Sequence, residues 1–341
     1  MNRNSFITCI ATALLTVCSC ANTGSAAGRE AAPVTGQLLL AEDQQSVWDS
    51  KLADRSRFMM NIKPTAEEKK IAKKFSQTFV ANLNNSKFFM HYLLTKLQEN
   101  DLPIELVAIP MIESGMNPNV RPNAGAHGPW QYIRSTGKSL GLKRSQNYDE
   151  LYDFVRTTDA SVSYLKRLYK DLDHNWDMVI AAYNQGEWGV RRAMKQARAR
   201  GVKVYTANNV KLSKGARRYV KRFHAFADML KNPKNYGITF PEIKNRPAFK
   251  RVQVAGRLNS MKQAAKLSGT SLETLKHLNA GYRTDRLETH GKHGLLVPTE
   301  DASRLEKALE QYSKDVSKNA VAGTKTDKKG SDKKGSDKKA M

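Results

Sequence analysis

Cysteine is scarce in this chain of 341 residues, which has three, all within the first twenty positions. The rest of the chain therefore cannot form a disulfide framework. The seven histidines lack the spacing of a metal site such as His-Glu-x-x-His, so the sequence predicts no metal and no cofactor. Acidic residues are in the minority, and 57 Lys and Arg against 32 Asp and Glu give a formal net charge of +25. This charge fits a nucleic acid, a membrane surface or an acidic polymer as partner, and does not decide among them.

The first residues have the pattern of a secretory signal. Arg3 precedes an apolar run that ends near Val17, and the small Ser19 stands before Cys20. The run is too short to span a membrane as a stable helix. The alternative is a buried N-terminal helix, but the following polar residues offer it little to pack against. Residues 1–19 are thus predicted to be a signal peptide, and export argues against a nucleic-acid partner.

The signal resembles that of bacterial lipoproteins, in which a small residue precedes the cysteine that receives the lipid. This resemblance implies lipid attachment at Cys20 and a membrane partner. Cleavage there leaves one thiol, blocked by lipid, whereas three reduced cysteines in a cytosolic protein would leave their confinement to the N-terminus unexplained. Ala21 stands where Asp would favour inner-membrane retention. The expected location is the periplasmic face of the outer membrane.

Apolar periodicity divides the rest of the chain into segments. Residues 20–65 show little periodicity and are predicted to be a flexible tether. Residues 66–240 are predicted to form a helical domain without strands, since Phe75, Phe79 and Leu83 and similar sets recur at helical spacing. A Pro-rich hinge follows at 240–247.

The C-terminal part has a different pattern. Residues 247–312 are predicted to form a small α+β unit in the order strand, helix, helix, strand. Residues 313–341 are Lys-rich and repetitive, and are predicted to be disordered, either simply solvated or weakly bound to an anionic wall or lipid surface. The predicted fold class is mainly α, with the α+β unit after the helical domain.

Glu113 is the leading candidate for chemistry. It falls in the last turn of an apolar helix predicted over 102–115, directly after Met111 and Ile112. Apolar neighbours disfavour the charged carboxylate, so its pKa should rise and the group can donate a proton near neutral pH. The alternative is an ordinary solvated glutamate at a helix end.

Two later segments carry side chains suited to a sugar site. Residues 125–131 form a Gly-rich turn that ends in Trp130 and Gln131, and residues 181–186 include Tyr183 and Asn184 at the end of an apolar helix. Aromatic faces cover the apolar side of a sugar ring, and amides bond acetamido and hydroxyl groups. Taken alone, these residues could equally be core aromatics and helix caps.

The order of these motifs, followed by Tyr219-Val220, resembles that of the lytic murein transglycosylases, and most of all their membrane-bound D-type members. The resemblance covers roughly residues 85–300 and implies a goose-lysozyme-like helical domain. It implies that Glu113 performs both proton transfers. It also implies five substrate-binding residues. Ser114 would support Glu113, and Gln131 would hold the acetamido group. Tyr183 and Asn184 would line the cleft, and Tyr219 would approach the sugar. Pro122 stands where relatives often have serine.

The expected reaction needs a single carboxyl group. A hydrolase with two carboxylates would need a partner about 5 to 9.5 Å away, and Glu105 would lie about 12 Å away along a straight helix. The family mechanism implies non-hydrolytic cleavage of the MurNAc-GlcNAc β-1,4 bond in peptidoglycan glycan strands, leaving 1,6-anhydro-MurNAc ends. The alternatives are a non-catalytic wall-binding scaffold and a basic nucleic-acid binder.

The second unit resembles a divergent LysM module, a small wall-binding fold of two helices on two strands. The usual Gly-Asp-Thr turn is replaced here by Gly256-Arg257-Leu258-Asn259-Ser260. Glycan binding and a purely structural cap both remain open for this unit.

Overall fold

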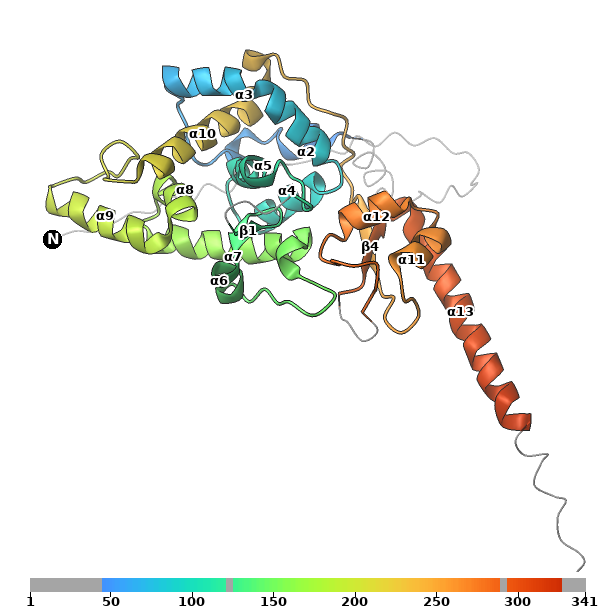
Figure 1. The fold of residues 1–341 in the computed structure, drawn as a ribbon. Helices are drawn as coiled ribbons and strands as arrows, with labels where there is room; N and C mark the ends of the chain where they lie inside the picture. Colours follow the sequence, from blue (N-terminus) through green and yellow to red (C-terminus); the bar gives the residue numbers. More distant parts are fainter. Residues whose placement is uncertain (1–44, 121–124, 289–292, 327–341) are drawn as a thin grey trace, which may run out of the picture.

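The computed structural model describes residues 45–120, 125–288 and 293–326. It consists of a helical body, a smaller α+β unit beside it, and a long helix that extends away from that unit (Figure 1). The prediction of a mainly α fold with a small α+β part is confirmed. None of the helices in the described ranges is long and apolar enough to cross a membrane. Cys20 and the predicted signal peptide lie outside these ranges.

The body contains α2 (Val47–Lys51), α3 (Ala66–Asn85), α4 (Met90–Glu99), α5 (Ala108–Ser114), α6 (Arg134–Ser139), α7 (Phe154–Asp171), α8 (Trp176–Gln185), α9 (Glu187–Ala199) and α10 (Lys214–Lys231), with 3-10 helices η1 (Arg55–Arg57), η2 (Ile104–Val107), η3 (Glu150–Tyr152) and η4 (Pro233–Tyr236).

Helix α10 lies against α3, α5 and α8 at the centre of the body. It begins where the Ser213 hydroxyl accepts a hydrogen bond from the Ala216 amide, and its apolar face buries Val220, Phe223 and Phe226. The edge of the Phe226 ring meets Phe79 of α3 at 5.5 Å between centroids. This packing fixes the face of α10 that carries Tyr219.

A buried polar cluster also joins these helices. His224 of α10 lies between Glu68 of α3 and Asp177 of α8, with 2.8 Å from each ring nitrogen to a carboxylate oxygen. Although burial opposes the charge, the hydrogen bonds to Asp177 and Glu68 raise the pKa of His224 to about 9. Glu68 also closes a capping box with Thr65 at the start of α3.

The predicted tether at 20–65 is wrong for residues 45–65. Val47 and Trp48 of α2 are buried in the core of the body. The Trp48 indole donates to the Pro241 carbonyl at 2.6 Å, and the Val47 amide donates to the carbonyl of Ile243 at 2.7 Å. The expected hinge at 240–247 is therefore paired with this N-terminal segment. This packing could not be predicted from the sequence of residues 45–65, because few apolar residues take part in it.

Two further details of the body differ from the prediction. A two-stranded antiparallel sheet, β1 (Ala126–His127) with β2 (Tyr132–Ile133), interrupts the helices. The helix expected over 102–115 is a 3-10 helix followed by α5. Pro110 accounts for the break, since it has no amide hydrogen to continue the α-helical pattern.

The second unit has the predicted order, with β3 (Phe249–Val252), α11 (Met261–Ser268), α12 (Leu272–Leu278) and β4 (Leu295–Pro298), and β3 pairs with β4 in antiparallel register. Helix α13 (Thr299–Thr326) follows at once and packs Ala302, Leu305 and Leu309 into the core of the unit. The tail predicted from residue 313 is therefore helical up to Thr326, where Ala and Lys favour helix. Residues 327–341 lie outside the described ranges.

The two units are joined by a specific interface. Tyr148 belongs to the body but is buried in the core of the second unit, where it stacks on His293 at 3.9 Å and meets Tyr282 edge-on at 4.6 Å. The Asp149 amide donates to the Gly281 carbonyl at 2.8 Å. The second unit is thus packed against the body through the segment that leads into α7.

Candidate active site

Glu113 occupies the last turn of α5. The helix ends because Gly115 takes a left-handed conformation, with φ of 63°. Asn82 of α3 donates from its amide to the Met111 carbonyl at 2.8 Å, and a Cβ at position 115 would come within 2.7 Å of the Asn82 Oδ1 atom. Glycine therefore serves both the conformation and the close contact, and α3 fixes the end of α5 beneath Glu113.

The carboxyl of Glu113 is largely withdrawn from water. Burial raises its pKa to about 7, while the hydrogen bond from Tyr219 and the positive charge of Arg222 act in the opposite direction. The Tyr219 hydroxyl donates to Oε1 of Glu113 at 2.6 Å. Desolvation outweighs both stabilising contacts, so a substantial fraction of Glu113 is protonated at neutral pH.

Arg222 is a site residue that the sequence reasoning did not identify. It stands one helical turn after Tyr219 on α10, so both side chains share the face directed at α5. Its guanidinium lies over the Phe75 ring, 4.6 Å from the centroid. The helical spacing from Tyr219 was the available signal, but an arginine in so basic a chain did not stand out.

Ser114 connects α5 to the Gly-rich turn. Its hydroxyl lies 2.8 Å from the Pro129 carbonyl and 3.1 Å from that of Pro110. In the described contacts it bonds to main-chain oxygens and not to Glu113. The serine thus positions the turn and the end of α5 relative to each other.

The turn itself carries Gln131, two residues after the Pro129 carbonyl that bonds Ser114. Gln131 has a positive φ of 50°, and its side-chain amide donates to the Gly128 carbonyl at 2.7 Å. Trp130 is fully buried, with its indole donating to the Thr158 hydroxyl at 3.0 Å. Trp130 therefore belongs to the core, whereas Gln131 is only partly buried. Pro122 lies outside the described residues.

Tyr183 and Asn184 come from the end of α8. The Tyr183 hydroxyl donates to the Trp130 carbonyl at 2.5 Å, and burial, aided by the nearby carboxyl of Glu113, raises the pKa of Tyr183 well above its usual value. Asn184 is exposed at the helix end, next to Gly215 at the start of α10. The structure therefore brings all six candidate positions to the region where α5, α8, α10 and the turn meet.

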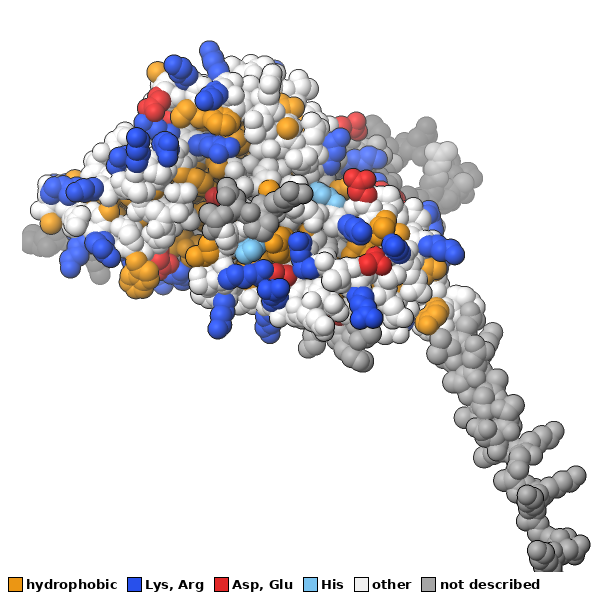
Figure 2. Space-filling model, in the orientation of Figure 1, with side chains coloured by type: hydrophobic (Ala, Val, Ile, Leu, Met, Phe, Trp, Pro, Cys, Tyr) orange, Lys and Arg blue, Asp and Glu red, His pale blue; other side chains and the backbone are white. Residues whose placement is uncertain are grey.

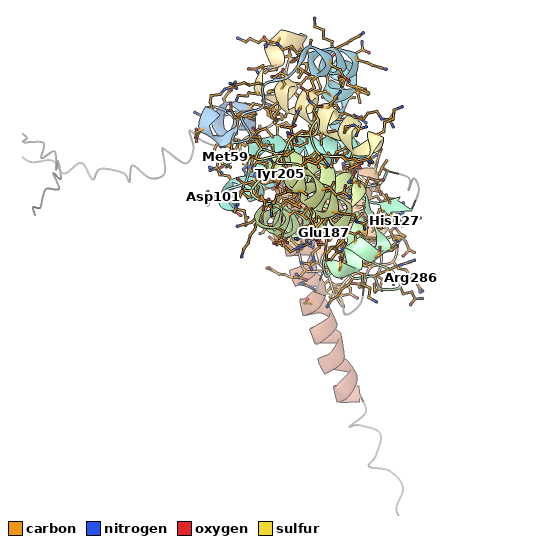
Figure 3. The ribbon with its side chains drawn as sticks, turned by 90° about the vertical axis from the view of Figure 1, so that its left-hand side faces the viewer. Met59, Asp101, His127, Glu187, Tyr205 and Arg286 are labelled. Carbon is orange, nitrogen blue, oxygen red and sulfur yellow. The ribbon has the colours of Figure 1, made fainter. Side chains whose placement is uncertain are left out.

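Glu105 faces a different part of the molecule. It is buried, and its Oε1 accepts a hydrogen bond from the Met60 amide at 3.0 Å. In Figure 3, Met59 and Asp101, which are close to Glu105 in space or sequence, lie at the edge opposite His127 of β1. The charged group that acts on Glu113 is the cation Arg222, and no carboxylate of the described residues shares the site. Nor do the described residues include a cluster of side chains that could hold a metal ion.

The fold and the site together define a class: a lysozyme-like helical domain with one central, partly desolvated glutamate. Residues 94–206 match the family model "Transglycosylase SLT domain". Residues 248–314 match the model "Lytic transglycosylase MltD, LysM-like domain". The chain thus carries a transglycosylase SLT domain followed by a LysM-like domain of the type found in lytic transglycosylase MltD.

Two known proteins are similar to this chain in sequence. Membrane-bound lytic murein transglycosylase D of Escherichia coli is 35% identical over 221 residues, which are 65% of this chain and 48% of the relative. The chain thus matches about half the length of that protein. A putative tributyltin chloride resistance protein of Alteromonas sp. is 30% identical over 162 residues, which are 47% of this chain and 75% of the relative.

Two solved structures also resemble the chain over part of its length. An inactive mutant of lytic transglycosylase Slt from Pseudomonas aeruginosa has a TM-score of 0.35 at 20% identity, covering 42% of this chain and 24% of that one. The 70 kDa soluble lytic transglycosylase of Escherichia coli has a TM-score of 0.36 at 19% identity, covering 57% and 36%.

Gly128 offers a test of how the turn is held. Its φ is 72°, and an added Cβ would lie 1.7 Å from the Leu151 carbonyl oxygen of η3. We predict that Gly128→Ala lowers the free energy of unfolding by about 3 kcal/mol or more, because backbone must move. The control is Gly141→Ala, which shares a left-handed φ of 79° but meets open space, and should cost about 1 kcal/mol. Chemical denaturation measures both, and equal losses would show that η3 does not restrain the turn.

Proposed function

We propose that the protein is a peptidoglycan lytic transglycosylase that cleaves the MurNAc-GlcNAc β-1,4 bond without water and leaves 1,6-anhydro-MurNAc ends. The observation that carries this proposal is the Glu113 carboxyl, with its pKa raised to about 7 and Tyr219 bonded to it. One group that is easily protonated and easily ionised can act first as acid and then as base.

In the first step, protonated Glu113 donates its proton to the glycosidic oxygen, and the bond from that oxygen to the MurNAc anomeric carbon breaks. The acetamido oxygen of the same sugar stabilises the positive charge at that carbon. The Tyr219 hydroxyl and the nearby charge of Arg222 stabilise the carboxylate left on Glu113. The site is lined by Gln131, Tyr183 and Asn184, and these side chains hold the sugar.

In the second step, ionised Glu113 removes the proton from the 6-hydroxyl of the MurNAc ring. That oxygen forms a bond to the anomeric carbon and closes the 1,6-anhydro ring. Glu113 regains its proton, so the cycle is balanced without water or cofactor. A mechanism with two carboxylates is less compatible with this site, because the charged neighbour of Glu113 is a cation.

We further propose that residues 66–240 act as the catalytic domain and 247–312 as a LysM-like module, which contacts the same polymer. Figure 2 supports an anionic polymer as substrate, since Lys and Arg are spread over both units on the face shown and acidic side chains are fewer.

Replacement of the carboxyl by an amide tests the acid/base role. Glu113→Gln keeps the shape of the side chain but cannot donate the proton. We predict a loss of about 10²- to 10⁴-fold in the release of muropeptides from purified peptidoglycan, with melting behaviour preserved. Glu105→Gln, a buried glutamate in the preceding segment, is the control and should retain activity. Comparable loss in both variants would argue for a different mechanism.

The pH dependence follows from the direction of the Glu113 shift. The acid must be protonated at the start of the reaction, and its pKa is raised to about 7. The value of kcat/KM should therefore fall as the pH rises above about 7. Tyr219→Phe removes a hydrogen bond that lowers this pKa, so the falling limb should move to higher pH, by about one unit. Tyr164→Phe, nearby but not bonded to Glu113, should leave the limb in place. A limb unmoved in Tyr219→Phe would contradict the assigned role of that hydroxyl.

Lipid attachment at Cys20 is part of the proposal for the cellular location. A relative is named as membrane-bound, the first twenty residues resemble a lipoprotein signal, and Ala21 after Cys20 favours the outer membrane. We predict that Cys20→Ala moves the protein from the membrane pellet to the soluble periplasmic fraction. Cell fractionation with an antibody against the protein measures this, and a variant that stays wholly in the pellet would indicate another anchor.

A further inference from the structure

An open cavity of about 760 Å³ lies at the junction of the two units. The body contributes Phe88, Asn117 and Asn119, and α12 of the second unit contributes Thr274, Lys276 and His277. In Figure 1, α12 lies on the side of the second unit that faces the body. Neither domain forms this cavity alone, and its volume is in the range that accommodates ligands the size of small molecules or oligosaccharide segments.

The loop that carries the asparagines follows directly from the catalytic helix. Asn117 is four residues after Glu113, so their Cα atoms are no more than about 15 Å apart. The loop is fixed by hydrogen bonds from the Asn117 amide to the Ser114 carbonyl at 3.3 Å and from the Asn85 side chain to the Gly115 carbonyl at 3.2 Å. One wall of the cavity and the catalytic helix are therefore joined by a short, hydrogen-bonded segment.

The lining combines flat apolar rings with amides. His277 lies 6.3 Å from Phe88 and 5.5 Å from the buried Phe89, measured between ring centroids. Burial lowers the pKa of His277, so the ring is uncharged at neutral pH. The Asn117 Oδ1 accepts from the Asn119 amide at 2.9 Å, which directs its NH₂ group to other partners. Rings that cover apolar faces and amides that pair with acetamido groups suit N-acetylated sugars.

The cavity is built before a ligand arrives, because the two units are packed against each other, with Tyr148 of the body buried in the core of the second unit. Within the second unit, the Asn279 side chain at the end of α12 bonds to the amide and carbonyl of Leu296 in β4, at 2.7 Å each, and Leu278, Ala280 and Leu296 pack into the core of the body. A preformed site loses less conformational entropy when it binds a ligand than two units joined by a flexible tether would.

We propose that this junction cavity is a second glycan-binding site, which takes N-acetylated sugar rings of the same strand beyond the catalytic cleft. This inference rests on the proposed function, since it assumes that the strand lies across Glu113. It assigns to the second unit a place within one continuous substrate path. The enzyme should then bind long glycans more tightly than glycans that fill only the cleft.

The test places a bulky tryptophan side chain in the cavity, from one wall at a time. Asn119→Trp changes the body and Lys276→Trp changes α12, and both original side chains are exposed. Lys266→Trp, on the exposed side of α11 and not part of the lining, is the matched control. All three are combined with Glu113→Gln to prevent cleavage, and melting curves verify that each variant is folded. Calorimetry then measures the affinity for oligomers of N-acetylglucosamine of increasing length.

We expect affinity in the control to rise with oligomer length, and each cavity variant to lose about tenfold on long oligomers, a difference of 1.4 kcal/mol, with short oligomers unaffected. Equal affinities in all three variants at every length would overturn the proposal. A gain with length seen only for peptidoglycan fragments that carry stem peptides would also overturn it, because the ligand would then be peptide. Turnover of short fragments by the same variants with Glu113 restored tests the proposed function separately.

Discussion

The removal of one carboxyl group from water is the constraint around which this site is organised. Glu113 is held between α5 and α10, and burial raises its pKa from 4.5 to about 7 against the opposing effects of Tyr219 and Arg222. That shift corresponds to about 3 kcal/mol of preference for the neutral form. Such a cost is tolerable because the surrounding helices are fixed independently, by the Phe79–Phe226 contact and the His224 cluster. The packing of α10 thus keeps Glu113 buried, although burial of this ionisable group does not favour the stability of the fold.

The second unit is connected to the same site through a series of contacts and is not merely tethered. Asp153 begins α7 by accepting from the Val155 and Arg156 amides, and its other oxygen accepts from the Tyr148 hydroxyl at 2.5 Å. Tyr148 is in turn buried in the core of the second unit. The intervening η3 presses its Leu151 carbonyl against Gly128. Docking of the second unit therefore supports the turn that places Gln131.

The sequence carried enough information to predict the helical class, the order of strands and helices in the second unit and Glu113 as the leading candidate for chemistry. These features depend on periodicity and on motif order, which a single sequence displays. It did not predict the burial of Val47 and Trp48, or the role of Arg222, because each depends on contacts between segments far apart in the chain. The change from 3-10 to α-helix before α5 was locally readable from Pro110, since proline lacks the amide that would continue an α-helix from the preceding residues. The resemblance implied that Ser114 supports Glu113, and in the structure the Ser114 hydroxyl bonds to the main-chain carbonyls of Pro110 and Pro129.

The polar side chains around Glu113 divide into two groups by what they bond. Ser114 and Tyr183 donate to the carbonyls of Pro129 and Trp130, two consecutive residues of one turn. Both hydroxyl groups therefore donate their hydrogen to the protein itself, and the two bonds hold the turn to α5 and to α8. Asn184 is exposed, and Gln131 is partly exposed although its side-chain NH₂ group donates to the Gly128 carbonyl. The site thus has a rigid frame of hydroxyl-to-carbonyl bonds that carries a small number of adaptable amides, and specificity for an N-acetylated sugar would reside in the amides while the frame determines their distance from the acid.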